Sequence, residues 1–282
     1  MAIIFKEVNF VYSPEMPYAF KALKNIDLEI AMGKKTAIIG ETGSGKSTLV
    51  QHLNALLLPT SGELEILDHK IIAGSKNKGL KGLRAKVGLV FQFSEYQLFE
   101  ETIIKDVAFG PKNFGDDEKN ATIKAIKALK MVGLDESYFE RSPLDLSGGQ
   151  KRRVAIAGIL AMNPEVIVLD EPTAGLDPRG SLEMLELFEM LNKQYHKTII
   201  IVTHDNEIVY HHCDDVVLLA DGEIKYHGLA KTFYESSAFK NDIMLPPKDI
   251  AFIDALKKVG FEISDYDLSK AISKTVKVLK HE

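Results

Sequence analysis

The sequence predicts an α/β protein with a parallel-sheet core, an antiparallel β subdomain and a small C-terminal helical appendage. Three observations indicate this. From residue 36 onward, short apolar runs alternate with helical patterns, which is typical of parallel strands joined by helices. Residues 3–30 instead alternate between apolar and polar positions, as antiparallel strands with one solvent-facing side do. After Gly228 the pattern changes to two helical segments that follow Pro246-Pro247.

The composition is that of an ordinary globular chain. Its 282 residues are 45% hydrophobic and 27% charged, which suits one large domain and a small appendage. The formal net charge of −5 gives no general attraction to nucleic acid or anionic lipid. Cys213 is the only cysteine, so we expect no internal disulfide, and a reducing cytosol fits. No signal peptide is visible, and the apolar runs are far shorter than the roughly 20 residues that cross a bilayer, so we expect a protein soluble by itself.

The first 60 residues predict strands followed by a helix. Turn residues between positions 13 and 17 divide residues 3–30 into antiparallel strands. Residues 36–39 (TAII) predict a short buried strand that runs into a glycine-rich loop, and a helix follows from Ser47 until just before Pro59. The residues expected on its apolar face are Leu49, Val50, Leu53, Leu56 and Leu57.

The middle of the chain returns to strands and then to helices. Residues 62–90 predict strands interrupted by a lysine- and glycine-rich loop, Gly74–Gly82. Residues 116–132 predict an amphipathic helix that Gly133 ends. The inward residues expected on it are Ile123, Ile126 and Leu129. A further helix begins after the sequence LSGGQ and ends at Asn163-Pro164.

The last third completes the sheet and adds the appendage. Its predicted elements are two buried strands at 166–169 and 198–203, a helix between them at 182–191, a hairpin at 216–226 turning at Asp221-Gly222, and appendage helices at 249–259 and 268–279. In parallel sheets of this kind, ligands bind at the carboxyl ends of the strands.

The loop GETGSGKST lies between the predicted strand and helix, where a phosphate-binding loop belongs. Its glycines let successive backbone N–H groups point at phosphate oxygens, and the helix start adds a partial positive charge. Lys46 is placed to reach the β and γ phosphates of a nucleoside triphosphate, and Ser47 to ligate Mg²⁺. The expected nucleotide-contacting residues are Gly40, Glu41, Thr42, Gly43, Ser44, Gly45, Lys46, Ser47 and Thr48.

The run VIVLDE predicts a second part of the same site. Its buried strand places Asp170 beside the phosphate loop, where the carboxylate can hold Mg²⁺ through water. Glu171 comes next and is the natural general base for the attacking water, a role worth about 10²–10⁴-fold in rate. The alternative is an acidic pair that caps the helix after Pro172.

Three further residues carry weaker signals. Gln92 follows a predicted strand, 87–91, and could ligate Mg²⁺ or position water. His204 follows another strand and should lie near a γ phosphate, although lone histidines at strand ends are more often structural. Tyr12 could stack on adenine, a contact worth roughly 1–3 kcal/mol, or could pack within the β-sheet.

The sequence LSGGQ predicts a second phosphate-binding device. A serine hydroxyl, bare glycine backbone and a helix N-terminus together form an anion receptor, and an ordinary helix cap is the alternative. One domain cannot fold both devices onto one phosphate, whereas two facing domains can. The residues concerned are Ser147, Gly148, Gly149 and Gln150.

Over residues 3 to about 228 the chain resembles the nucleotide-binding domain of the ATP-binding-cassette (ABC) superfamily, whose core is a P-loop, RecA-like sheet. The resemblance implies ATP and Mg²⁺ as cofactors and a dimer in which the LSGGQ of one domain completes the site of the other. It makes Glu171 the base, His204 the γ-phosphate switch and Asp177 part of the crossing loop. The implied domains are 1–228, with a helical subdomain at about 93–160, and 229–282, an appendage for dimerisation.

The runs QLFEETI and FGPKN resemble the second-type ATPases of energy-coupling-factor (ECF) vitamin transporters. That resemblance implies a first-type sister chain in a heterodimer, a transmembrane coupling subunit, a substrate-binding membrane subunit, and a place on the cytoplasmic face of the membrane. Glu41 and Ser94 depart from the pattern, which commonly has His and Pro there; we expect the Glu41 side chain to point away from the phosphates. Phe93, Tyr96 and Phe99 are either core residues or partner-facing, and we expect at least one to face a partner.

Two other functions remain open at this point. One is the ATPase of a transporter dedicated to a single cargo. The other is an ABC protein that acts on nucleic acid or the ribosome, although the long coiled coils, zinc inserts or tandem cassettes usual in that class are not visible. A homodimer is chemically possible because the chain carries every motif itself, and the cargo leaves no trace in this sequence.

Overall fold

The computed structural model describes residues 2–75, 78–239, 245–261, 263 and 266–279. A six-stranded sheet forms its centre, parallel except at one edge strand. In spatial order its strands are β10 (Glu223–Leu229), β9 (Asp215–Ala220), β3 (Lys35–Ile39), β8 (Thr198–Val202), β7 (Val166–Asp170) and β6 (Val87–Val90). Because β3, β8, β7 and β6 run parallel, their carboxyl ends meet at one edge of the sheet.

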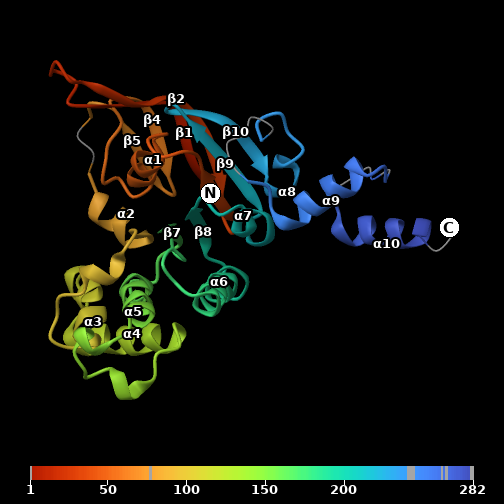
Figure 1. Cartoon of the computed structure of the whole chain (residues 1–282). Helices are drawn as coiled ribbons and strands as arrows, with labels where there is room; N and C mark the ends of the chain where they lie inside the picture. Colours follow the sequence, from red (N-terminus) through yellow and green to blue (C-terminus); the bar gives the residue numbers. More distant parts are fainter. Residues whose placement is uncertain (1, 76–77, 240–244, 262, 264–265, 280–282) are drawn as a thin grey trace.

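A second, antiparallel sheet covers one face of the first (Figure 1). Its strands, in spatial order, are β2 (Phe20–Ala31), β1 (Ala2–Tyr12), β4 (Ser61–Ile66) and β5 (His69–Ile72). The long β1–β2 ribbon carries three register irregularities, and local irregularities of this kind increase the twist of a sheet.

Two groups of helices lie away from the sheets. In Figure 1, α3, α4 and α5 form a cluster at the lower left, and α9 and α10 project on the opposite side of the molecule. The helices are α1 (Lys46–Leu53), α2 (Leu80–Lys86), α3 (Ile103–Asn113), α4 (Glu118–Met131), α5 (Gly148–Leu160), α6 (Pro178–Lys193), α7 (Asn206–His212), α8 (Ala230–Phe233), α9 (Lys248–Lys258) and α10 (Leu268–Leu279), with short 3-10 turns η1 (Ser94–Gln97), η2 (Glu136–Tyr138) and η3 (Pro143–Asp145).

The parallel strands of the central sheet are buried on both faces, and their residues alternate between two cores. Ile38 of β3 packs with the antiparallel sheet and α1, whereas its neighbours Ala37 and Ile39 pack with the helices on the other face. Each of these side chains is fully buried, and burial of an isoleucine contributes about 1.5–3 kcal/mol. Successive side chains of a strand point to opposite faces of the sheet, so one continuous apolar run contributes to both cores.

The predicted fold class is confirmed, and the hairpin turn is confirmed in detail. Asp221 and Gly222 have φ values of 52° and 77°, and a two-residue turn with both φ angles positive matches the twist of the flanking strands. The appendage patterns also correspond to helices, α9 and α10. None of the helices in the described part of the chain combines the length and apolar character needed to cross a membrane.

Two predictions of local structure were wrong, and two elements were missed. The helix after the glycine loop ends at Leu53, because Ala55 turns the backbone left-handed (φ 54°). The loop predicted at Gly74–Gly82 gives way to α2 at Leu80, and the 3-10 turn η1 and helix α3 were not foreseen.

Ile123 on α4 was also predicted wrongly: it is 54% exposed rather than inward. The inward face of α4 consists of Ala121, Ala125, Ala128 and Leu129. A period-3.6 reading that counts only large apolar residues misses a face built from alanine.

Candidate active site

The phosphate-loop motif and the acidic pair meet at the carboxyl edge of the central sheet, as predicted. They enclose a cavity of about 420 Å³. Its lining residues are Phe20, Ala22, Thr42, Gly43, Gly45, Lys46, Ser47, Thr48, Gln92, Asp170, Glu171, Val202 and His204. Side chains from β2, the phosphate loop, α1 and the loops after β6, β7 and β8 thus converge on one space.

The glycines of the phosphate loop are required by close contacts and by backbone angles. A Cβ on Gly40 (φ 147°) would lie 2.1 Å from the Leu219 carbonyl oxygen, and one on Gly45 (φ 105°) would lie 2.7 Å from that of Ala22. No side chain larger than hydrogen fits at either position. The Ser44 hydroxyl oxygen is buried inside the loop without a hydrogen-bond partner.

Lys46 opens α1 and lies across the phosphate loop. Its Nζ donates to the carbonyl oxygens of Gly40 at 2.7 Å and Glu41 at 2.8 Å. Burial lowers the pKa of this ammonium group, while the carboxylates of Glu171 and Asp170 oppose the shift. A half-buried cation held only by neutral carbonyls on its loop is suited to exchange them for phosphate oxygens.

Asp170 ends β7 with its carboxyl group half-buried. Desolvation raises the pKa of this carboxyl, the neighbouring Glu171 raises it further, and Lys46 lowers it. A desolvated carboxylate of this kind is stabilised by a nearby cation.

The oxygen atoms that face the cavity suit Mg²⁺. Ser47, Gln92 and Asp170 all line it and offer a hydroxyl, an amide carbonyl and a carboxylate, the hard donors that Mg²⁺ takes. Within the described residues, no cluster of three or more His, Cys, Asp or Glu side chains could hold a metal ion. The donor set therefore resembles a magnesium site that shares its ligands with phosphate, rather than an all-protein cage.

Glu171 and His204 form a hydrogen-bonded pair at the mouth of the cavity. His204 Nδ1 donates to Glu171 Oε1 over 2.8 Å, and the Glu171 N–H donates to the carbonyl oxygen of Val202 at 2.9 Å. Glu171 has a left-handed backbone (φ 49°), an uncommon conformation for this residue type that clusters at functional sites. This geometry excludes the reading of Glu171 as a helix-capping residue, because α6 begins only at Pro178, capped by Asp177.

Tyr12 does not line the cavity; its neighbour Phe20 does. Tyr12 lies directly opposite Phe20 across β1 and β2, donates to or accepts from the Thr48 hydroxyl at 3.2 Å, and packs edge-on against Phe10. The contact with Phe10 agrees with the β-packing alternative for Tyr12, and stacking of Tyr12 on adenine stays a prediction. Phe20 and Ala22 were missed because nothing in their local sequence marks them; only the strand pairing brings them to the loop.

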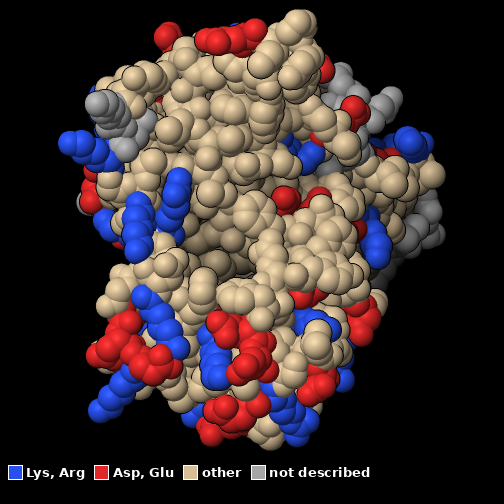
Figure 2. Space-filling model, turned by 90° about the vertical axis from the view of Figure 1, so that its left-hand side faces the viewer, with Lys and Arg blue, Asp and Glu red and all other residues tan. Residues whose placement is uncertain are grey.

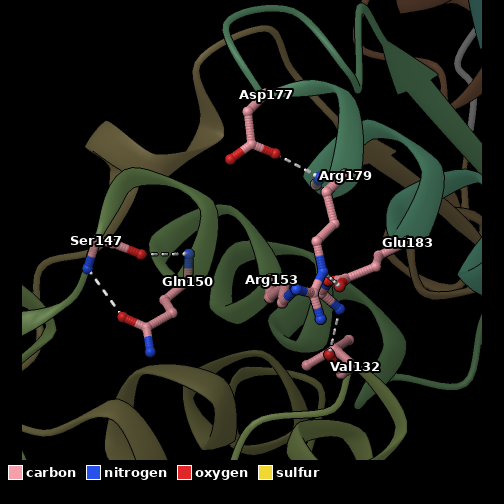
Figure 3. Close-up of polar contacts among 8 residues, drawn as sticks. Val132, Ser147, Gln150, Arg153, Asp177, Arg179 and Glu183 are labelled. Atoms are coloured by element: carbon pink, nitrogen blue, oxygen red, sulfur yellow. Dashed lines mark hydrogen bonds and ion pairs between the residues drawn. The ribbon is translucent and has the colours of Figure 1, made fainter.

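The LSGGQ loop, predicted as a second phosphate-binding device, lies away from this cavity. Ser147 caps α5 in a reciprocal pair: its hydroxyl accepts from the Gln150 N–H at 3.3 Å, and its own N–H donates to Gln150 Oε1 at 3.0 Å (Figure 3). Asp177 caps α6 by accepting from the Gly180 N–H at 2.6 Å. Neither Ser147 nor Asp177 lines the cavity, so within one chain the two devices are separate, as the sequence argument required.

Charged contacts hold these two helix starts together. Arg153 of α5 donates to the Val132 carbonyl at 2.8 Å and pairs with Glu183 of α6 at 2.7 Å; Arg179 pairs with the same carboxylate at 3.0 Å (Figure 3). The LSGGQ loop and the loop carrying Asp177 are thereby presented by helices that are fixed to each other.

A second cavity of about 780 Å³ adjoins the first. Glu41 lines this one and not the first, in keeping with the expectation that its side chain points away from the phosphates. The appendage reaches its edge: Asn206 donates to the Leu245 carbonyl, and the Lys248 N–H donates to Glu207 Oε1 at 2.8 Å. The appendage is thus attached to α7, which begins two residues after His204.

Comparison with known proteins identifies what this chain is similar to. A family model described as ABC transporter matches residues 23–174. The energy-coupling factor transporter ATP-binding protein EcfA2 of Lactiplantibacillus plantarum is 51% identical, with 96% of this chain and 92% of that protein aligned. The protein of the same name from Spiroplasma kunkelii is 46% identical, over 99% and 92% of the two chains.

Two solved structures share the fold. The cbiO1 protein of Clostridium perfringens, described as part of the ABC transporter complex cbiONQ, superposes with a TM-score of 0.74 at 38% identity, over 92% of this chain and 96% of that one. The ATP-binding cassette MJ0796, a dimer in a post-hydrolysis state bound to ADP and Pi, gives a TM-score of 0.71 at 33% identity, over 81% and 98%.

Proposed function

The chain belongs to the ABC transporter family, and on this basis we propose the following roles for its residues and partners. The chain is the ATP-binding subunit of an ECF-type importer, and its hydrolysis of ATP is coupled to transport by separate membrane subunits. One observation carries the assignment of its chemistry: Glu171 and His204 form a 2.8 Å pair at the mouth of a cavity that Lys46 also lines.

The site residues divide into binding and chemical roles. Lys46 and the loop N–H groups bind the β and γ phosphates, and Ser47, Gln92 and Asp170 hold Mg²⁺, which when bound neutralises charge on the phosphates. Glu171 accepts the proton of the attacking water. His204 orients the Glu171 carboxylate through Nδ1 and contacts the γ phosphate, and Gln92 senses the filled site. Tyr12 and Phe20 together offer the aromatic edge for adenine.

We propose that a second chain supplies the missing half of each site. Ser147, Gly148, Gly149, Gln150 and Asp177 lie outside the cavity of their own chain, and the MJ0796 cassette with ADP and Pi is a dimer. The partner is a first-type sister ATPase in a heterodimer, as the resemblance to ECF proteins implies.

Residues 1–228 form the cassette, with 93–160 as its helical subdomain. The appendage 229–282 supports the dimer through exposed apolar residues such as Phe252 and Ile272.

The surface after Gln92 fits a protein partner in the membrane. Phe93, Tyr96 and Phe99 are 48%, 83% and 63% exposed, so they are not core residues. Phe99 lines a groove of about 230 Å³, which Leu98, Phe109 and Met162 also line in part. Figure 2 shows the face that carries α2 and α3: charged side chains gather over its lower, helical part, whereas the hollowed middle is mostly uncharged.

We assign this surface, which we call the partner-facing segment (residues 93–99), to the transmembrane coupling subunit. A substrate-binding membrane subunit completes the complex. Membrane contact is then made only through these proteins, on the cytoplasmic face, and nucleic acid has no part in the function.

The function is tested by reconstituting the complex and replacing Glu171 with Gln. Hydrolysis and cargo uptake should fall about 10²–10⁴-fold, because the general base is lost, while ATP binding persists. Glu186→Gln, on the exposed face of α6, is the matched control and should leave both activities unchanged. Hydrolysis at the wild-type rate by the Glu171→Gln complex would exclude the assigned base, and hydrolysis without uptake in the wild type would exclude the transport function.

A further inference from the structure

Arg152 is a buried arginine whose contacts the proposed chemistry does not use. It lies in α5, five positions after Ser147, and is only 4% exposed. Its guanidinium group contacts Glu95 twice, Nε to Oε2 at 3.2 Å and Nη2 to Oε1 at 2.9 Å. The Glu95 side chain is also largely buried, at 13% exposure. A forked, desolvated pair of this kind is strong and geometrically specific.

The remaining donor of Arg152 points toward the catalytic loop. Nη1 donates to the carbonyl oxygens of Pro172 at 3.2 Å and Ala174 at 2.5 Å. Both belong to the turn that starts at Glu171, in which the Ala174 N–H donates to the Glu171 carbonyl at 3.2 Å. Arg152 therefore holds the turn that sets the left-handed backbone of Glu171.

Glu95 belongs to the partner-facing segment. It lies in η1, between exposed Phe93 and Tyr96, but its carboxylate is directed inward to Arg152. A displacement of η1 must either move the guanidinium group or break its two bonds to Glu95. One side chain thus joins the partner-facing segment, the helix that begins at Ser147, and the turn that carries Glu171.

We propose that Arg152 is a positioning residue that transmits the position of the partner-facing segment to Glu171. The inference rests on the proposed function, because it needs a membrane subunit bound to that segment. When the subunit moves η1, the forked contact carries the shift to the carbonyls of Pro172 and Ala174, and the Glu171 carboxylate changes its aim at the attacking water. The contacts of Arg152 with Glu95 and with the two carbonyl oxygens are each either formed or broken, and packed elements of this kind shift between discrete arrangements rather than deform continuously.

The test is a double-mutant cycle in the reconstituted complex: Arg152→Lys, Glu95→Gln and the two together. Lysine keeps the charge, but its three donors lie on one nitrogen and cannot reproduce the four hydrogen bonds of Arg152, which include the forked pair with Glu95. Each single variant should lower kcat for ATP hydrolysis by about two- to thirtyfold and reduce stimulation by the membrane subunits, while KM for ATP stays unchanged, since neither residue lines the cavity. The double variant should be no worse than the more severe single one.

Arg141→Lys serves as the matched control, because Arg141 is exposed in the same subdomain and its side chain contacts Ser137 and Tyr138, away from η1 and the Glu171 turn. Thermal unfolding and ATP binding of each variant establish that it folds. If Arg152→Lys does not fold, Glu95→Gln still tests the contact between Glu95 and Arg152, because glutamine keeps the shape and volume of the side chain. Additive effects, a raised KM with kcat unchanged, or behaviour like Arg141→Lys would overturn the proposal. A wild-type complex that hydrolyses ATP without uptake would refute the transport function instead. In that case, comparing the kcat values of the single and double variants would still test the link between Glu95 and Arg152.

Discussion

Asp170 is a residue whose ionised side chain lowers the stability of the folded chain but suits the binding of a cation. Its carboxyl group is half-buried beside Glu171, so burial and like charge both raise its pKa, and only Lys46 opposes them. A group that is unfavourable in the empty site becomes favourable when a divalent cation enters. Residues of this kind are expected where a protein binds a charged ligand.

This property predicts the behaviour of Asp170→Asn. The pKa of the Asp170 carboxyl is higher in the folded chain than in the unfolded chain, so the folded chain keeps this proton to a higher pH. The stability that protonation gives is therefore lost as pH rises from the ordinary aspartate range through the folded-state pKa. Above that window the ionised carboxylate destabilises the empty protein. The amide removes this cost, so Tm without nucleotide should rise, by roughly 2–4 °C if the relief is about 1 kcal/mol.

Scanning calorimetry at neutral pH measures the change, with the exposed Asp145→Asn as control. Magnesium-dependent hydrolysis should disappear in the same Asp170 variant, and Mg²⁺ with ATP should stabilise it less than the wild type. A lower Tm for the empty Asp170 variant would contradict the burial argument.

At the scale of elements, α4 illustrates packing by small residues. It lies against α3 and α5, and its inward side chains at 121, 125 and 128 are alanines, so the helices approach closely. The period of the helix was readable, and Leu129 and Ile126 do pack toward the core as predicted. Ile123 was placed wrongly, because it is larger and more apolar than the alanines that are in fact inside.

The alanine face predicts opposite sensitivities on one helix. Ala125→Leu forces extra methylenes into a closely packed interface and should lower the free energy of unfolding by about 1–3 kcal/mol. Ile123→Ala, on the exposed side, should change it by less than about 0.5 kcal/mol. Urea unfolding of both variants checks this, and a larger loss from Ile123→Ala than from Ala125→Leu would show that α4 is turned the other way.

At the scale of the whole molecule, the separation of the two phosphate-binding devices is the main feature. The cavity carries Lys46 and Glu171, and the capped helix that begins after Ser147 points elsewhere. In the proposed dimer, a full site is therefore made by two chains. The fixed contact between α5 and α6 through Arg153 and Glu183 presents Ser147 and Asp177 together to a partner.

The dimer predicts complementation between defective chains. Ser147→Arg and Lys46→Ala should each abolish hydrolysis in the complex by at least about 10²-fold, since each spoils a different half of a site. Ser142→Arg, which replaces a neighbouring helix-capping serine, should retain activity. Rates of phosphate release measure this, and Ser147→Arg hydrolysing at the wild-type rate would exclude the shared site.

Mixing the two inactive variants also distinguishes the kinds of dimer. If two copies of this chain paired, the mixture would regain activity, because one Lys46 would face one intact Ser147. The proposed heterodimer predicts no recovery from mixing, because each variant chain pairs with a sister chain and not with the other variant. Recovery without the sister would contradict the heterodimer and support a homodimer.

Much of the site could be predicted from the sequence, because its motifs are local. The glycines of the phosphate loop, Lys46 and Ser47 follow one another, and Asp170 and Glu171 end a strand whose apolar run marks it as buried. The carboxyl edge of a parallel sheet then brings them together without further information. The same holds for Asp221-Gly222, whose turn type follows from residue preference alone.

Only the tertiary structure decided the contacts between segments distant in the chain. Phe20 reaches the cavity through its pairing with Tyr12, the buried face of α4 depends on how closely its neighbours approach, and Arg152 meets Glu95 and the Glu171 turn only after α5 has packed. Backbone conformation and short motifs are set by neighbours in sequence. Burial and side-chain partners are set by which surfaces meet, and no local pattern carries that information.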